Sequence, residues 1–293
     1  MVKISAKTLT KSRAKTSAKS RTVNRVTTQK AMPTAAVLVI GNEILSGRTN
    51  DANLHYLARR LTEIGIRLAE ARVVEDDAEA IGKALNALRR AHTYVFTTGG
   101  IGPTHDDITA ESVAKALKLP LITDKSALAL LKAHYERRGT TLNAARKRMA
   151  RMPKGSTLVE NPVSSAPGFR IKNVFVMAGV PLIMQAMFES VAGTLQGGPP
   201  LLSRTVRVSL PEGDFAAALG KLQNRFADVS IGSYPMFLRR DPGVRIVLRS
   251  QDAARLAAAV EGLFALIAGL GGTAEEIFPD AALAKPPLSG STP

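Results

Sequence analysis

The sequence predicts an α/β protein with a doubly wound, mostly parallel sheet, followed by a small α+β domain. Short apolar runs alternate with helix-patterned segments in the first part of the chain, the links between them are short, and the order of elements changes after a Gly/Pro-rich stretch at 196–200. Alternation of this kind is typical of right-handed β-α-β units. With 45% hydrophobic and 22% charged side chains, the 293 residues can bury a full core.

The first β-α-β unit begins at residue 37. Residues 37–40 form a continuous apolar run, typical of a strand covered on both faces. Apolar side chains then recur every three or four residues, which predicts a helix over 54–64 that ends at Gly65. A second strand is expected over 66–74 and a second helix over 81–88.

The same patterns continue along the chain. A strand over 94–98 runs into a glycine loop, and segments 169–171 and 174–176 flank Lys172 and Asn173 as in a tight hairpin. The remaining elements are helices over 111–117, 126–138 and 183–195, then strand 205–209, helix 215–226, strands 229–234 and 245–249, and helix 254–270. The last five predict a small βαββα domain with an antiparallel pairing.

Four segments are therefore expected. Residues 1–33 form a disordered basic leader, 34–198 a ligand-binding α/β domain, 199–271 the small domain, and 272–293 a flexible tail. The leader is interpreted first as an unstructured or over-called start, because Met32 precedes the first strand. A targeting segment and a basic arm for nucleic acid or anionic lipid are the alternatives.

The charge balance narrows the choice of partners. The net charge is +16, but 1–31 hold nine basic residues and no acid, so the remainder carries 31 minus 24, or +7. This is an ordinary basic globule, and nucleic acid is an unlikely partner. There is no cysteine, no apolar run of transmembrane length, and only four histidines. A cytoplasmic protein without membrane contact is expected, in which any metal is held by carboxylates.

Two polar loops follow predicted strands, at 41–50 and 99–107. Ligands of open α/β sheets bind at the carboxyl ends of the strands, so both loops are expected to line one crevice. Neither loop fits the Walker or the dinucleotide pattern. Their glycine amides predict an anion cradle, with Arg48 as a phosphate clamp and Thr104 or Asp106 as a helix cap. The candidate phosphate-binding residues here are Gly41, Arg48, Asn50, Gly99, Gly100, Gly102 and Thr104.

Acidic residues follow three of the predicted strands. Such carboxylates could hold a divalent cation that neutralises a pyrophosphate, although each alone is equally typical of solvated surface or of a helix start. The candidate metal ligands are Glu43, Asp76, Asp106 and Asp107.

Three separated motifs resemble the competence/damage-inducible protein A family, whose N-terminal domain belongs to the molybdopterin-binding MoaB/Mog superfamily. They are 41–50, 99–107 and 161–168, and the strand at 231–235 is also similar. The resemblance implies a domain that binds a phosphorylated pterin, with molybdopterin as one such ligand, or a nucleotide, in a homo-oligomer (dimer or trimer). It adds Ser165, Gly168 and Gly179 to the expected ligand site. The deamidase activity of the C-terminal amidase domain that long members carry is not expected here, and the expected Gly-Thr-Ala-Pro-Gly motif begins with Ser164 instead of glycine.

The resemblance also implies an activity. The family is associated with metal-dependent hydrolysis of ADP-ribose-type pyrophosphates, and a related domain fronts eukaryotic FAD synthase. The expected enzyme is a Mg-, Mn- or Co-dependent pyrophosphatase acting on ADP-ribose- or FAD-like substrates, with catalytic residues Asp106, Asp107 and His105. The alternatives are a non-catalytic pterin- or nucleotide-binding protein and a molybdenum cofactor biosynthesis factor.

Overall fold

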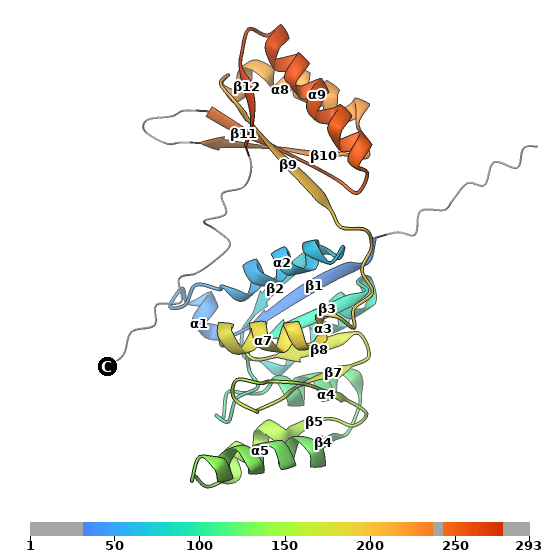
Figure 1. The fold of residues 1–293 in the computed structure, drawn as a ribbon. Helices are drawn as coiled ribbons and strands as arrows, with labels where there is room; N and C mark the ends of the chain where they lie inside the picture. The colour runs from blue at the N-terminus through green and yellow to red at the C-terminus, as the bar shows by residue number, and fades with distance from the viewer. Residues whose placement is uncertain (1–31, 237–242, 278–293) are drawn as a thin grey trace, which may run out of the picture. The chain divides into compact units, whose positions relative to one another are not determined.

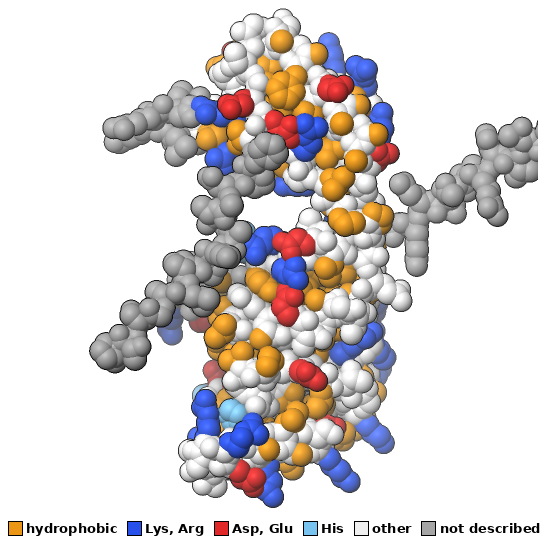
Figure 2. Space-filling model, in the orientation of Figure 1, with side chains coloured by type: hydrophobic (Ala, Val, Ile, Leu, Met, Phe, Trp, Pro, Cys, Tyr) orange, Lys and Arg blue, Asp and Glu red, His pale blue; other side chains and the backbone are white. Residues whose placement is uncertain are grey.

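A computed structural model describes residues 32–236 and 243–277 (Figure 1). The predicted leader therefore lies outside the described residues, except for Met32 and Pro33. The helices and strands form two groups, one over residues 34–192 and one over residues 202–277. Basic and acidic side chains are interspersed on the face of the molecule that Figure 2 shows.

The first group is built around a six-stranded sheet of order β2-β1-β3-β8-β7-β6. The first four strands are parallel, whereas β7 and β6 each run antiparallel to the neighbour before them. The strands are β1 (Thr34–Ile40), β2 (Arg67–Val74), β3 (Tyr94–Thr98), β6 (Thr157–Val159), β7 (Gly168–Ile171) and β8 (Val174–Met177). This confirms the predicted mostly parallel sheet and the hairpin at Lys172.

Helices cover both faces of this sheet. Helices α2 (Asn53–Glu63) and α7 (Pro181–Ala192) pack on one face, while α3 (Ala78–Ala91) and α4 (Thr109–Leu117) pack on the other. Successive side chains of a strand point to opposite faces, so a strand covered twice must be apolar at nearly every position. In β1, six of the seven residues are buried.

Aromatic rings fix the face under α2 and α7. The Phe96 and Phe175 rings, on the neighbouring strands β3 and β8, are stacked with centroids 5.1 Å apart. Phe188 of α7 meets Phe96 edge-on at 5.5 Å. Such pairs each contribute about 0.5–1.5 kcal/mol beyond their burial, so they tie α7 firmly to the centre of the sheet.

Shorter elements complete the first group. They are α1 (Asn42–Leu45), β4 (Leu121–Thr123), α5 (Lys125–Arg137), α6 (Ala144–Lys147), η1 (Arg148–Ala150) and β5 (Arg151–Pro153). One of them, α5, has 13 residues and confirms the helix predicted over 126–138. The sequence patterns missed the others because each spans only three or four residues. Strands β4 and β5 pair as a separate two-stranded sheet.

The second group is a four-stranded antiparallel sheet of order β10-β11-β9-β12. Its elements are β9 (Leu202–Val208), α8 (Glu212–Arg225), β10 (Ser230–Met236), β11 (Gly243–Ser250), α9 (Ala253–Gly269) and β12 (Ala274–Ile277). Both helices lie on the same side of this sheet, around a core that includes Phe215 and Leu263 (Figure 1).

The predicted boundary of the tail is wrong. Residues 274–277 were expected to be flexible, but they form β12, which pairs with β9 and extends the predicted βαββα order to βαββαβ. Glu275 and Glu276 lower the strand propensity of this segment, which is why it was missed. Residues 278–293 lie outside the described residues.

Candidate functional site

The main cavity lies at the carboxyl ends of the parallel strands of the first group. Its volume is about 540 Å³. Strand order reverses between β1 and β3, since the chain continues from β1 to β2 on one side and then to β3 on the other. Crevices of open α/β sheets form at such a point. The cavity is lined by residues of five connections: Glu43 and Thr49; Gly99–Pro103 and Asp107; Met149; Asn161, Ser164 and Ala166; and Ala178–Pro181 with Ile183.

Gly99 brings two of these connections together. Its φ is +101°, and a Cβ atom there would lie 2.1 Å from the carbonyl oxygen of Ile40, the last residue of β1. Only glycine fits such a backbone position. A Cβ atom on Gly179 would lie 3.3 Å from the Cα atom of Gly99, so the loops after β3 and β8 also pass close to each other.

The glycine loop is anchored to α4 and keeps several amides free. The Thr109 hydroxyl donates to the Gly99 carbonyl at 3.0 Å, and the Thr109 amide donates to Gly100 at 3.0 Å. In the described part of the chain, no hydrogen bond uses the amides of Gly100, Ile101 or Gly102. Amides held in this way can donate to an anion in the cavity.

The start of α7 forms another wall. Val180 is its N-cap and provides no side-chain cap, and Pro181 occupies the first turn. The side chain of Asn53, 4% exposed, donates from Nδ2 to the Gly179 carbonyl at 2.7 Å and so fixes the turn into α7. The amino end of a helix carries a partial positive charge, so this wall also favours an anionic group.

Two carboxylates face the cavity from different loops. Glu43 folds back on its own loop, where a Cβ atom on Gly41 would meet its oxygens at 2.5 and 2.6 Å. Asp107 lies against Gly102 in the same manner, at 2.5 Å. The predicted meeting of Glu43 and Gly100 in one crevice is thus observed.

Hydrogen bonds orient Asp107. Its Oδ2 atom accepts the amide of Thr104 at 2.8 Å and also the Thr104 hydroxyl, so Thr104 serves the loop and not the helix. The expectation that Thr104 or Asp106 caps α4 is wrong, because Ile108 is the N-cap residue and no side chain caps it.

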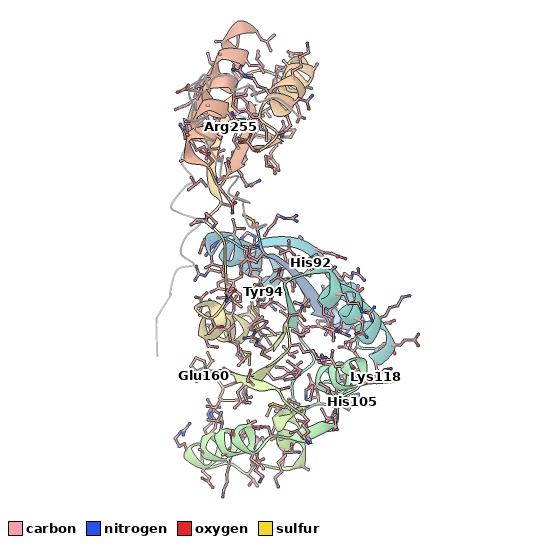
Figure 3. The ribbon with its side chains drawn as sticks, turned by 90° about the vertical axis from the view of Figure 1, so that its right-hand side faces the viewer. His92, Tyr94, His105, Lys118, Glu160 and Arg255 are labelled. Atoms are coloured by element: carbon pink, nitrogen blue, oxygen red, sulfur yellow. The ribbon has the colours of Figure 1, made fainter. Side chains whose placement is uncertain are left out.

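Asp106 and His105 do not reach the cavity. Their side chains are 63% and 98% exposed, and His105 lies in the loop before α4 (Figure 3). The nearby polar side chain of Thr104, the backbone amide of Asp106 itself, and then His105 and Arg148 hold the pKa of the Asp106 carboxyl below its usual range, so it is ionised at neutral pH. Of the three predicted catalytic residues, only Asp107 lines the cavity.

Asp76 has a structural task. Its Oδ2 atom accepts the amide of Asn42 at 2.9 Å, at the start of α1. Because β2 is the edge strand beyond β1, the loop after it lies beside the loop after β1 and away from the cavity. Across residues 32–236 and 243–277, no group of three or more acidic or His side chains is placed to hold a metal ion. The predicted four-carboxylate set is therefore not assembled.

Some of the other predicted ligand residues line the cavity and others lie outside it. Gly99, Gly100, Gly102 and Gly179 line the cavity, whereas Arg48 and Asn50 are exposed beside it. Ser165 points elsewhere, with its hydroxyl 3.1 Å from Nδ1 of His134. Gly168 has a packing role, since a Cβ atom there would lie 2.2 Å from the carbonyl oxygen of Val176 on β8.

Two cavity residues were missed by the site prediction. Asn161, 7% exposed, accepts the amides of Val163 and Ser164 at 3.1 Å each and donates to the Ala166 carbonyl at 2.8 Å. It thereby folds its loop around its own side chain, and Ser164 rather than Ser165 faces the cavity. An Asn followed by Pro in a polar loop was the available signal.

Two arginines behind the glycine loop are held by other partners. Arg151 pairs with Glu111 at 2.7 Å, and Arg148 lies 3.7 Å from the same carboxylate and 3.4 Å from the Asp107 carbonyl. Neither arginine lines the main cavity. Its lining, all within the described residues, contains two carboxylates and no Lys, Arg or His.

Comparison with known families agrees with this geometry. Residues 36–197 match the family described as "Probable molybdopterin binding domain". The chain belongs to this family. Residues 200–270 match the model "FAD synthase, middle domain". The molybdopterin-binding domain thus contains the whole cavity, and the βαββαβ group corresponds to the second match. The described residues include no helix long and apolar enough to cross a membrane.

Individual relatives cover both matches. A Pyrobaculum calidifontis protein is 36% identical over 72% of this chain and 84% of its own length. A Caenorhabditis elegans protein called "Probable FAD synthase" is 31% identical over 80% of this chain, which spans 50% of that protein. Among solved structures, CinA from Thermoplasma acidophilum, titled as of unknown function, is 35% identical with a TM-score of 0.52, covering 55% of this chain and 97% of that one.

Proposed function

We propose that the cavity binds a phosphorylated pterin or nucleotide together with a divalent cation, and that it hydrolyses the pyrophosphate of ADP-ribose- or FAD-like substrates. The observation that carries the proposal is the charge of the lining, which consists of Glu43 and Asp107 without a basic side chain. Like charges brought together in a site cost several kcal/mol. A phosphate therefore needs a cation between itself and these carboxylates.

The two carboxylates suit magnesium-type coordination. Mg²⁺ is usually held by one or two carboxylates, several waters and the phosphates of the substrate, not by an all-protein cage. Glu43 and Asp107 would supply the protein ligands, and the absence of a three-carboxylate group among the described residues fits a cation that arrives with its substrate. When bound, such a cation neutralises phosphate oxygens and lowers the pKa of a water that it coordinates.

The remaining walls position the rest of the ligand. The amides of Gly100, Ile101 and Gly102 donate to phosphate oxygens, and the amino end of α7 adds its partial positive charge. Ile101, Met149 and Ile183 provide apolar surface for a pterin or purine ring. Likeness to a probable FAD synthase favours FAD among the substrates to be tested.

The test measures binding and turnover on the purified full chain. We expect ADP-ribose and FAD to bind at least tenfold more weakly after chelation of divalent ions. With Mg²⁺, Mn²⁺ or Co²⁺ present, one water should cleave the pyrophosphate bond, so that ADP-ribose gives AMP and ribose 5-phosphate and FAD gives AMP and FMN. Glu43→Gln and Asp107→Asn should each remove the cation dependence. Asp106→Asn is the matched control, since that side chain is 63% exposed outside the cavity.

Two outcomes count against the proposal. Phosphorylated ligands that bind equally with and without a cation overturn the bridging role of the carboxylates. Cation-dependent binding without any product removes the hydrolase and leaves a carrier or sensor of the same ligands. A homo-oligomer and a cytoplasmic location stay predictions.

A further inference from the structure

The sheet of the second group has one face covered by helices and one face left open in that group. Buried and exposed residues alternate along its central strands: Val206 and Val208 of β9 and Ile246 of β11 point toward α8 and α9. Because successive side chains of a strand point to opposite faces, the residues between them point to the other face. Figure 1 shows α8 and α9 on one side of this sheet. This open face is defined by Ser203, Thr205, Arg207, Ser230, Gly232, Tyr234, Arg245, Val247, Arg249 and Glu275.

Arginines are concentrated on the open face. Arg245 lies directly opposite Arg207 across the β11–β9 ladder, and Arg249 lies four residues further along β11. Arg207 has a partner of its own and also lies opposite Glu275. In the described residues, no ion pair involves Arg245 or Arg249. Like charges directly opposite each other destabilise a sheet, so this arrangement favours an anionic occupant.

The helix side has the opposite balance. Acidic residues gather there, namely Glu212, Asp214, Asp228, Asp252 and Glu261. Arg255 of α9, labelled in Figure 3, pairs with Asp228 at 2.7 Å, and Arg204 pairs with Glu276. On the open face, Arg245 and Arg249 have no acid partner among the described residues, whereas Arg204 and Arg255 on the helix side are paired.

An aromatic ring lies close to the backbone on the same face. A Cβ atom on Gly232 would be 3.0 Å from the ring and hydroxyl of Tyr234, so the tyrosine ring extends over the glycine two residues before it. Tyr234 is 49% exposed. An exposed ring supported by the sheet is a platform on which a nucleobase can stack.

The two unpaired arginines on the open face are farther apart than a single phosphate group can bridge. At about 3.4 Å per residue, Arg245 and Arg249 lie roughly 14 Å apart along β11. The terminal segments offer no acidic counterpart, because 1–31 are strongly basic and 278–293 contain one Asp and one Lys. A second copy that met this face with its own open face would bring the same positive charges. A partner with repeated negative charges and exposed bases satisfies both the arginines and the tyrosine.

We propose that the open face binds single-stranded nucleic acid, with Arg245 and Arg249 on the phosphate backbone and Tyr234 stacked on a base. This differs from the expectation drawn from the net charge, because the charge is concentrated locally on one face. Phosphate contacts supply affinity without sequence selection, so the binding is sequence-tolerant.

The test uses the full chain and a fluorescein-labelled oligouridine of about 12 nucleotides, followed by fluorescence anisotropy at several salt concentrations. Arg245→Gln with Arg249→Gln should lower the slope of log K against log salt by about 1.4, since each phosphate contact contributes about 0.7. Tyr234→Ala should weaken binding about fivefold or more without changing the slope, and Tyr234→Phe should bind like the unaltered chain.

A matched control lies on the other side of the same domain. Lys221→Gln with Arg225→Gln removes the same charge from two exposed positions of α8 and should leave the slope unchanged. Equal losses in the two double variants, or no loss in either, overturn the proposal and assign binding to the basic leader or to general charge. Competition by polyglutamate as strong as by unlabelled oligouridine overturns it in favour of an acidic protein partner.

Discussion

Asn53 is expected to control the turn into α7 without controlling the stability of the fold. Its Nδ2 atom holds the Gly179 carbonyl at 2.7 Å, but its Oδ1 atom is buried without a hydrogen-bond partner. Asn53→Ala loses a bond worth about 1 kcal/mol and also removes an unsatisfied oxygen whose burial costs about 1–3 kcal/mol. The two effects oppose each other, so the free energy of unfolding should change by less than about 1 kcal/mol.

The loss of the hydrogen bond to Gly179 also has a local effect on the turn into α7, and removal of the buried Oδ1 atom does not offset this effect. Residues 178–184 lose the bond that anchors their turn, and a loss of about 1 kcal/mol raises the population of the open state about fivefold. Hydrogen–deuterium exchange read by mass spectrometry should show faster exchange in peptides covering this segment. Urea unfolding followed by circular dichroism should show a nearly unchanged midpoint.

Asn86→Ala is the matched control. Asn86 also donates from Nδ2 to a backbone carbonyl, that of Ala116, at 3.3 Å, but it lies between α3 and α4 and away from the cavity. It should leave exchange in 178–184 unchanged. Unaltered exchange in Asn53→Ala, or an unfolding free energy lowered by more than about 2 kcal/mol, would refute the assigned role of this side chain.

Two further predictions concern stability. The hydrogen-bonded guanidinium of Arg60, 2.7 Å away, holds the pKa of the Glu189 carboxyl below its ordinary value, so this pair stabilises the fold above about pH 4.5 and loses its contribution as the pH falls through the lowered pKa. Glu189→Gln should lower the free energy of unfolding in urea at pH 7 by only about 1 kcal/mol, because the pair is partly exposed. The difference should shrink progressively below pH 4.5, since the carboxylate is then protonated. Gly99→Ala should prevent folding of the first domain, since its Cβ atom would overlap the Ile40 carbonyl, whereas Gly220→Ala in α8, with open space around it, should stabilise by about 0.5–1 kcal/mol.

Controls separate these effects from general loss of charge or of glycine. Glu160→Gln removes an exposed carboxylate and should show no pH-dependent difference from the unaltered chain. A Glu189→Gln deficit that stays constant down to pH 3 would contradict the ion-pair explanation. A folded Gly99→Ala domain with an intact cavity would contradict the close approach of the loops after β1 and β3.

The parallel sheet could be predicted because burial on both faces leaves an unmistakable pattern. Residues 94–98 were placed to the residue and 67–74 to within one residue, whereas the first strand was predicted over 37–40 and begins three residues earlier, at Thr34. Strands β4, β5 and β6 span three residues each, too few for a period of two to emerge above the background. Strand β12 was missed because Glu275 and Glu276 mask a segment that its pairing with β9 stabilises.

The site could be predicted to the level of loops but not of side chains. Glycine spacing located the cavity walls, since Gly99 and Gly179 are required by close backbone approaches. The acidic residues could not be sorted, because the direction of a carboxylate depends on local bonds such as those of Asp76 to Asn42 and of Asp107 to Thr104. No one-dimensional pattern records these bonds.

The all-acidic charge of the cavity lining has a consequence for ligand choice. Under the proposed cation bridge, a nucleoside and its diphosphate differ in what they need in order to bind. The neutral nucleoside binds without a metal ion, whereas the anionic diphosphate binds only together with one. The site would then respond to the supply of free Mg²⁺ as well as to the concentration of its ligand. A lower concentration of free Mg²⁺ would therefore release phosphorylated compounds from the cavity before neutral ones.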